Sequence, residues 1–184
     1  MLRRSRRHLC LAALGAVLPL RAWAGFNFWD SEYTATRAEL QAMLATQFPR
    51  SQRYGEIVTV VLSDPQLGLN AEANRAAITM HVSITSPLLR GKVDGTIALS
   101  SALRYDAAAR ALRLQQPRAE RLALEGVSGG DAERLLQIGG VVAQQVLEGQ
   151  VLRTFSVEEL TVGNKTYEIG DITVQVDGIM VQLK

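Results

Sequence analysis

The fold is decided by residues 76–105, AAITMHVSITSPLLRGKVDGTIALSSALRY, in which apolar and polar side chains alternate almost without a break. Ile78, Met80, Val82 and Ile84 would point one way, and the residues between them the other. A proline and a glycine near residue 90 interrupt the alternation, which then resumes. This pattern predicts two long antiparallel strands with one apolar and one wet face, each on the order of 35 Å long. Such a face needs an apolar partner of similar length.

That partner follows at residues 131–149, DAERLLQIGGVVAQQVLEG. No charged side chain occurs in residues 135–147, which is typical of a helix buried on most sides. We expect the helix to be capped by Asp131, to stop at Gly149 and to be roughly 28 Å long. The glycine pair at 139–140 lowers helix propensity and indicates close approach by another backbone or by a ligand.

A second, amphipathic helix is predicted upstream of the long strands. Thr36 and Glu39 have the spacing of a capping box, and Pro49 would end the helix. Shorter strands are predicted at residues 57–62, 111–114 and 122–124, with turns at Asp64-Pro65 and Gly68 after the first of them.

The C-terminal stretch ITVQVDGIMVQL, residues 172–183, predicts a hairpin because its apolar phase slips at Asp177-Gly178. A two-residue turn there would pair Val176 with Ile179, Val174 with Val181, and Ile172 with Leu183. The element order of helix, strands, helix and strands predicts an α+β fold. We expect a long curved antiparallel sheet wrapped around the apolar helix, in one domain over residues 25–184.

Residues 1–24 are interpreted as a cleaved secretory signal. They have a basic start, an apolar run over residues 9–20 and an Ala22-Trp23-Ala24 cleavage pattern. The run is shorter than the roughly 20 residues of a spanning helix. We therefore expect a periplasmic protein that begins at Gly25, exported by the Sec or, given Arg6-Arg7, the twin-arginine route.

Removal of this segment would change both the charge and the available chemistry. The formal net charge would fall from +2 to −3, so the basic character gives no reason to expect nucleic-acid binding. Cys10 is the single cysteine, so a mature chain would have no thiol nucleophile and no Cys-ligated metal.

Four acidic residues cluster late in the chain: Glu158, Glu159, Glu168 and Asp171. They are interpreted as a solvated edge, with a calcium site as the alternative. No cofactor and no metal are expected.

One motif raises an enzymatic alternative. Residues 126–130, Gly-Val-Ser-Gly-Gly, fit the Gly-x-Ser-x-Gly nucleophile pattern. A serine nucleophile needs a histidine base, and His81 is the single histidine after residue 24. Because His81 falls on the polar face of a predicted strand, we expect a non-enzyme and keep a serine hydrolase using Ser128 as a third hypothesis.

The order of motifs resembles a known family. YTATRAELQAMLATQFP (33–49), VVLSDPQLGLN (60–70), the two alternating strands, the apolar helix and VQVDGIMVQL (174–183) are similar to the YceB-like family of small bacterial envelope proteins of unassigned function. That family is similar in fold to tubular lipid-binding (TULIP) domains, in which a curved sheet wraps a helix and encloses an apolar channel. The resemblance implies a lipid or other apolar ligand. Many relatives carry a lipidated cysteine where this chain has Gly25.

The leading hypothesis is a non-enzymatic protein that binds a lipid or other apolar molecule between sheet and helix. The expected ligand-lining residues are Leu135, Ile138, Val142, Val146, Met80, Val82, Ile97, Leu99, Leu44 and Phe48. The alternative is a structural or interaction protein of the cell envelope with a closed core. Its sheet edge, or the aromatic stretch at residues 25–29, would contact an envelope protein or the membrane surface.

Overall fold

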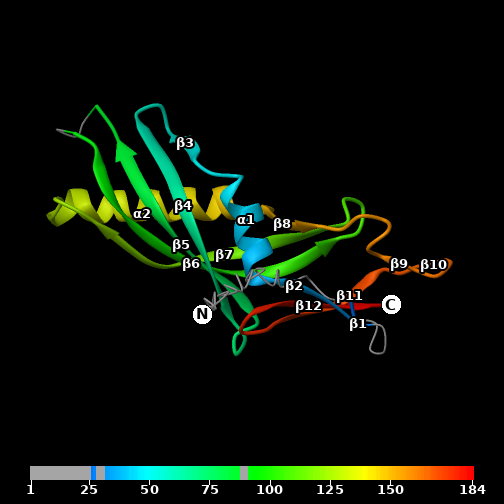
Figure 1. The fold of residues 1–184 in the computed structure, drawn as a ribbon. Coiled ribbons are helices and arrows are strands. Elements are labelled where there is room, and N and C mark those ends of the chain that lie inside the picture. The colour runs from blue at the N-terminus through cyan, green and yellow to red at the C-terminus, as the bar shows by residue number, and fades with distance from the viewer. Residues whose placement is uncertain (1–25, 28–31, 88–90) are drawn as a thin grey trace, which may run out of the picture.

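The computed structural model describes residues 26–27, 32–87 and 91–184 and shows an α+β fold with a strongly curled antiparallel sheet (Figure 1). The predicted class, α+β with an antiparallel sheet, is confirmed. The expected signal segment, with Cys10, lies outside the described residues. So do Gly25, Phe28 and Trp29 of the aromatic stretch.

Six strands form the larger sheet in the order β3-β4-β5-β6-β7-β8. They are β3 (Arg50–Tyr54), β4 (Val58–Asn70), β5 (Arg75–Thr85), β6 (Val93–Asp106), β7 (Ala111–Leu124) and β8 (Val151–Thr154). A four-stranded sheet has the order β1-β2-β12-β11, with β1 (Phe26–Asn27), β2 (Glu32–Thr36), β12 (Gly178–Leu183) and β11 (Ile169–Val174). The remaining elements are the β9 (Thr161–Val162) and β10 (Lys165–Thr166) pair and the helices α1 (Arg37–Ala45) and α2 (Gly129–Leu147).

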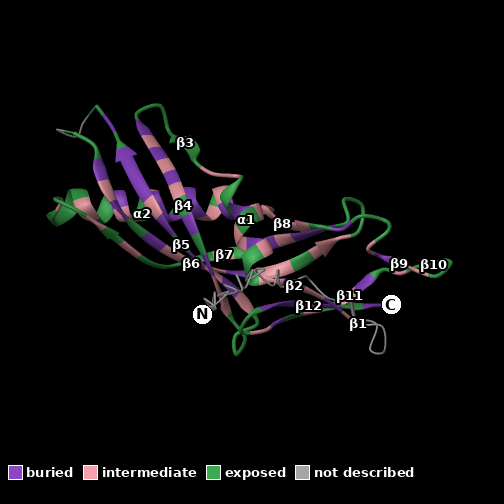
Figure 2. Ribbon diagram, in the orientation of Figure 1, coloured by how far each residue is buried: buried purple, intermediate pink, exposed green. Residues whose placement is uncertain are grey.

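The alternation in residues 76–105 produces the predicted pair of long strands. β5 has 11 residues and β6 has 14, and they pair in antiparallel register from Ala76 with Ser101 to Ile84 with Val93. Figure 2 shows buried residues recurring along β4, β5 and β6. Ile78 and Ile84 expose at most 1% of their surface, whereas Thr79 between them is exposed. The predicted apolar face is therefore confirmed.

β4 and β7 are longer than predicted because β-bulges carry each strand past a proline. β4 runs through Asp64-Pro65 and β7 through Gln116-Pro117, and the register shifts at both places. Asp64 and Gln116 have positive φ values of 52° and 49°. A bulge leaves a residue out of the ladder, so the missing proline N–H costs no pairing. The predicted turns at Asp64-Pro65 and Gly68, and the separate strands at 111–114 and 122–124, are therefore wrong.

A glutamine of α1 binds the bulge in β4. Gln41 Nε2 donates a hydrogen bond to the Pro65 carbonyl oxygen at 2.7 Å, and Leu67 N donates to Gln41 Oε1 at 2.6 Å. One amide thus satisfies a backbone acceptor within the irregular step and a backbone donor just after it. The predicted capping box starts this helix, since Glu39 N donates to Thr36 Oγ1 at 3.4 Å and Thr36 N donates to Glu39 Oε2 at 3.0 Å.

The C-terminal hairpin has a different register from the predicted one. Val174 pairs with Ile179 and Ile172 with Val181, across a turn closed by the hydrogen bond from Gln175 N to the Gly178 carbonyl oxygen. Val176 lies in this turn and is 79% exposed. Gly178 belongs to β12, where a Cβ atom would lie 2.6 Å from the Ala35 carbonyl oxygen of β2. The glycine is needed for that close approach and not for a two-residue turn.

Arg153 of β8 connects the two sheets. Its Nη2 donates to the Tyr33 hydroxyl of β2 at 2.7 Å and also pairs with Glu159. The guanidinium carbon lies 5.7 Å from the centre of the Tyr33 ring, and Phe155 packs edge-on against that ring at 5.4 Å. Burial raises the pKa of the Tyr33 hydroxyl above its ordinary value, more than the nearby Arg153 lowers it.

Replacing Gln41 with alanine should destabilise the protein by about 2 kcal/mol, because two backbone groups at the bulge lose their partner. Urea denaturation measures the change. Gln137→Ala, at an exposed helical glutamine, is the matched control and should change stability by no more than about 0.5 kcal/mol. Equal effects of the two substitutions would contradict the role assigned to the Gln41 amide.

Tyr33 should make the stability fall at alkaline pH. Its folded-state pKa is raised above 10.0, so the unfolded chain loses the proton first and the folded state is penalised as pH rises past that value. Denaturation midpoints at pH 9 and pH 11 should therefore differ less in Tyr33→Phe than in the wild type. Tyr54→Phe, at an exposed tyrosine, should retain the wild-type difference.

Candidate functional site

The candidate site is the interface between α2 and the six-stranded sheet. α2 contacts β7 most extensively and also touches β3, β4 and β5. In the sheet, β3 and β7 are separated by three other strands. One helix can meet both only because the sheet curls, so α2 lies between two distant parts of the same sheet.

The glycine pair of α2 brings the helix close to β7. A Cβ atom at Gly139 would lie 3.0 Å from Leu122 Cδ2 and 3.5 Å from Ile84 Cδ1, and one at Gly140 would lie 3.7 Å from Ala119 Cβ. Within the part of the chain that the structure describes, the atoms outside the helix that lie closest to these two Cβ positions belong to side chains of the sheet. The β7 side of the helix is therefore tightly packed.

The two ends of α2 are held differently. After its C-terminus, Gly149 N donates to the Leu114 carbonyl oxygen at 3.0 Å, and Leu114 N donates to the Gln150 carbonyl oxygen at 2.9 Å. Glu148 accepts a further hydrogen bond from Gln116 N of β7. The N-terminus begins at Gly129 after Ser128, whose side chain makes no capping hydrogen bond. Asp131 lies in the first turn, so its predicted role as the N-cap is wrong.

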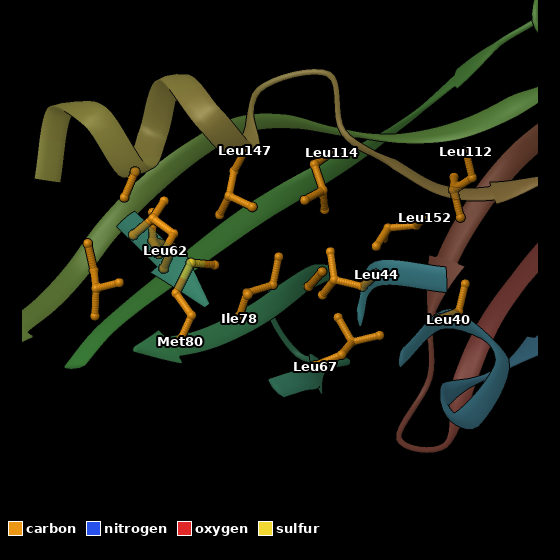
Figure 3. Close-up of a cluster of buried hydrophobic side chains, with 14 of the residues drawn as sticks. Leu40, Leu44, Leu62, Leu67, Ile78, Met80, Leu112, Leu114, Leu147 and Leu152 are labelled. Atoms are coloured by element: carbon orange, nitrogen blue, oxygen red, sulfur yellow. The ribbon is translucent and has the colours of Figure 1, made fainter. Parts of the chain in front are cut away.

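The ten predicted lining residues all belong to the core or pack against it. Five of them, from β5, β6 and α2, expose at most 1% of their surface: Met80, Val82, Ile97, Leu99 and Val142. Leu44 is fully buried and Leu135 is 6% exposed, whereas Ile138, Val146 and Phe48 are half-buried. Figure 3 shows Leu44, Met80 and Leu147 in one cluster. Nothing in the structure tests whether a ligand contacts these side chains, so their role stays a prediction.

The interior is closed at the five positions of β5, β6 and α2 that expose at most 1% of their surface. A side chain that exposes at most 1% of its surface borders almost no space that a water molecule could enter. Two pockets lined by described residues lie away from that interface. One, of about 780 Å³, lies between α1, the β4 bulge and the β11–β12 turn, and Phe48 borders another of about 210 Å³. A ligand at the sheet–helix interface would therefore have to displace α2.

The serine motif does not assemble a catalytic pair in the described part of the chain. Ser128 is exposed before α2, and the structure records no hydrogen bond between it and His81. His81 Nε2 instead lies 3.1 Å from Asp94 Oδ1 on the outer face of β5 and β6. Lys92, with its Nζ 3.0 Å from Asp94 Oδ1, lowers the pKa of that carboxyl.

The late acidic residues are engaged separately. Glu159 pairs with Arg153, and Asp171 lies 3.6 Å from Lys184 Nζ. Within residues 26–27, 32–87 and 91–184, no group of three or more His, Cys, Asp or Glu side chains is arranged to hold a metal ion. The same residues contain no helix that is both long and apolar enough to cross a membrane.

Comparison of the sequence with models of protein families and with curated proteins finds no match. The resemblance to the YceB-like family, and the ligand class that it implies, stay predictions.

Gly140→Ala should stabilise the protein by up to about 1 kcal/mol, because alanine favours the helix and its Cβ would make an ordinary contact with Ala119. Gly139→Ala should gain less, since its Cβ would force the Leu122 side chain to move. Thermal or urea denaturation of both variants checks the order. Stabilisation by Gly139→Ala but not by Gly140→Ala would refute the packing described for the two glycines.

Proposed function

We propose that this protein is a non-enzymatic periplasmic protein that binds the hydrocarbon part of a lipid, or another apolar molecule, between the six-stranded sheet and α2. The observation that carries the proposal is the contact of α2 with both β3 and β7, which supports a sheet that wraps around the helix. The inward side chains of β4, β5 and β6 and those of α2 that meet them are apolar. The resemblance to lipid-binding domains points to the same ligand class.

The free energy of binding is favourable only if the ligand replaces the apolar contacts that α2 makes with the sheet. An acyl chain that buries 300 Å² of apolar surface gains on the order of 7 kcal/mol, before the cost of association. Full exposure of three or four buried aliphatic side chains costs a similar amount, at about 1.5–3 kcal/mol each. Binding is therefore favourable when the ligand occupies the space that α2 vacates and covers the same side chains.

The N-terminal half of α2 is the part that moves in this proposal. It starts at Gly129-Gly130 without a side-chain cap and carries the half-buried Ile138. The C-terminal end stays attached through the backbone hydrogen bonds of Gly149 and Gln150 to β7. A helix held at one end opens a wedge-shaped space whose walls are the apolar face of β4, β5 and β6.

Delipidated, folded protein should bind a fluorescent fatty acid, and native mass spectrometry should detect lipid on gently purified protein. Ile138→Gln should weaken binding about 5-fold, because a half-buried apolar contact is lost. Val157→Gln, at an exposed valine outside α2, is the matched control and should bind as the wild type does. Amides of residues 130–138 should change their hydrogen exchange on binding more than those of residues 144–150.

A closed-core structural or interaction protein of the envelope is the second candidate function. The observation that favours it is the near-complete burial of Val82, Ile97 and Val142. It predicts that the folded, delipidated protein binds no fatty acid or phospholipid and that its exchange pattern does not change. That result would refute the proposed ligand binding.

A further inference from the structure

β3 presents polar side chains toward the interior of the curl. Arg50 pairs with Leu62, Gln52 with Val60, and Tyr54 with Val58. Residues directly opposite each other on paired strands lie on the same face of the sheet. Val58, Val60 and Leu62 are buried on the inner face, so their three partners also point inward. All of β3 is nevertheless exposed.

The two sides of α2 therefore differ. Toward β7 the helix is closed by the contacts of Gly139 and Gly140 with Leu122 and Ala119. Toward β3 it faces an edge strand whose inward side chains are a cation, an amide and a phenol, and all three reach solvent. Groups of this kind suit the polar rim of an entrance more than a core. The seam between β3 and α2 is thus the side on which an apolar molecule meets both water and the interior.

Arg50 has capacity to bind an anion at this seam. Its Nε donates to the Gln47 carbonyl oxygen at 2.8 Å, and no carboxylate pairs with it among the described residues. The nearest acids in the sequence lie elsewhere: Glu39 is hydrogen-bonded in the α1 cap, and Glu56 follows the other end of β3. α2 has no charged residue over 135–147. The guanidinium nitrogens beyond Nε are therefore available to a carboxylate or a phosphate.

We infer that the ligand is an anionic amphiphile whose head group binds Arg50 of β3, the edge strand that contacts α2. Its hydrocarbon chain passes inward toward Val60 and Leu62. The inference rests on the proposed function and narrows its ligand class. The Nε–Gln47 hydrogen bond holds the Arg50 side chain beside the connection between α1 and β3.

Arg53 provides a matched control on the same strand. It pairs with Thr59, so it points to the outer face, and it is exposed as Arg50 is. Both substitutions to glutamine remove one positive charge from β3. They differ in the face from which that charge is removed.

The test compares three probes with the same oleoyl chain: oleate, oleoyl lysophosphatidylglycerol and the neutral monooleoylglycerol. The wild type and Arg53→Gln should prefer at least one anionic probe over the neutral one by about 5-fold, the strength of an exposed charge pair. Arg50→Gln should bind all three equally, and Arg50→Lys should retain part of the preference. Preference for one anion alone supports the inference and identifies the head group as a carboxylate or a phosphate.

Other outcomes separate this inference from the proposed function. Binding of all probes without charge preference in the wild type, or equal loss of preference in Arg50→Gln and Arg53→Gln, overturns the role of Arg50 and leaves apolar binding in place. Absence of binding to every probe by folded protein overturns the proposed function itself. Denaturation curves of each variant establish that the protein measured is folded.

Discussion

Burial of one long apolar face is the constraint on which the rest of the structure depends. β4, β5 and β6 place aliphatic side chains on the same side, and water must be excluded from all of them. If the sheet were flat, a single helix would cover only part of that face and leave most of it exposed to water. Curling brings β3 and β7 toward the same helix, so one α2 contributes to covering a wide sheet. The glycine pair at 139–140 lets the helix approach β7 closely enough for this to succeed.

Side-chain amides connect parts of the molecule that are not joined by hydrogen bonds between paired strands. Gln41 binds the β4 bulge at Pro65 and the residue Leu67 just after it, and Gln47 Nε2 donates to the Val151 carbonyl oxygen of β8. Asn74, in the β4–β5 turn, donates to the Ile172 carbonyl oxygen and accepts from Val174 N of β11. Gln41 and Asn74 each use both the donor and the acceptor of the amide, as a peptide group does, whereas Gln47 donates to the backbone of β8. With Arg153, these contacts form a frame that does not depend on the N-terminal half of α2.

This division gives the proposed function a physical basis. A frame held by ladders and amides can keep its curl while one end of α2 moves, because few of its hydrogen bonds involve that end. Under the proposed function, the closed interior would be the ligand-free packing, in which the helix covers the side chains that a hydrocarbon chain would cover after binding. Affinity in such an arrangement is reduced by the free energy of opening. The proposed head-group contact with Arg50 would contribute selectivity among amphiphiles without adding to that cost, since Arg50 is already exposed.

The sequence by itself determined the elements whose patterns are local. Alternation predicted β5 and β6, and the Thr36 and Glu39 spacing predicted the cap of α1, because side-chain periodicity and capping depend on neighbours within a few residues. The apolar character of the candidate interface was also readable from sequence. Tertiary structure decided the bulges, the hairpin register and the strand β3, since Pro65, Gly178 and Arg50 derive their roles from partners distant in the chain. β3 is wholly polar and exposed, so no periodicity reveals it, and the side chains at the seam become identifiable only when pairing with β4 fixes the face to which each of them points.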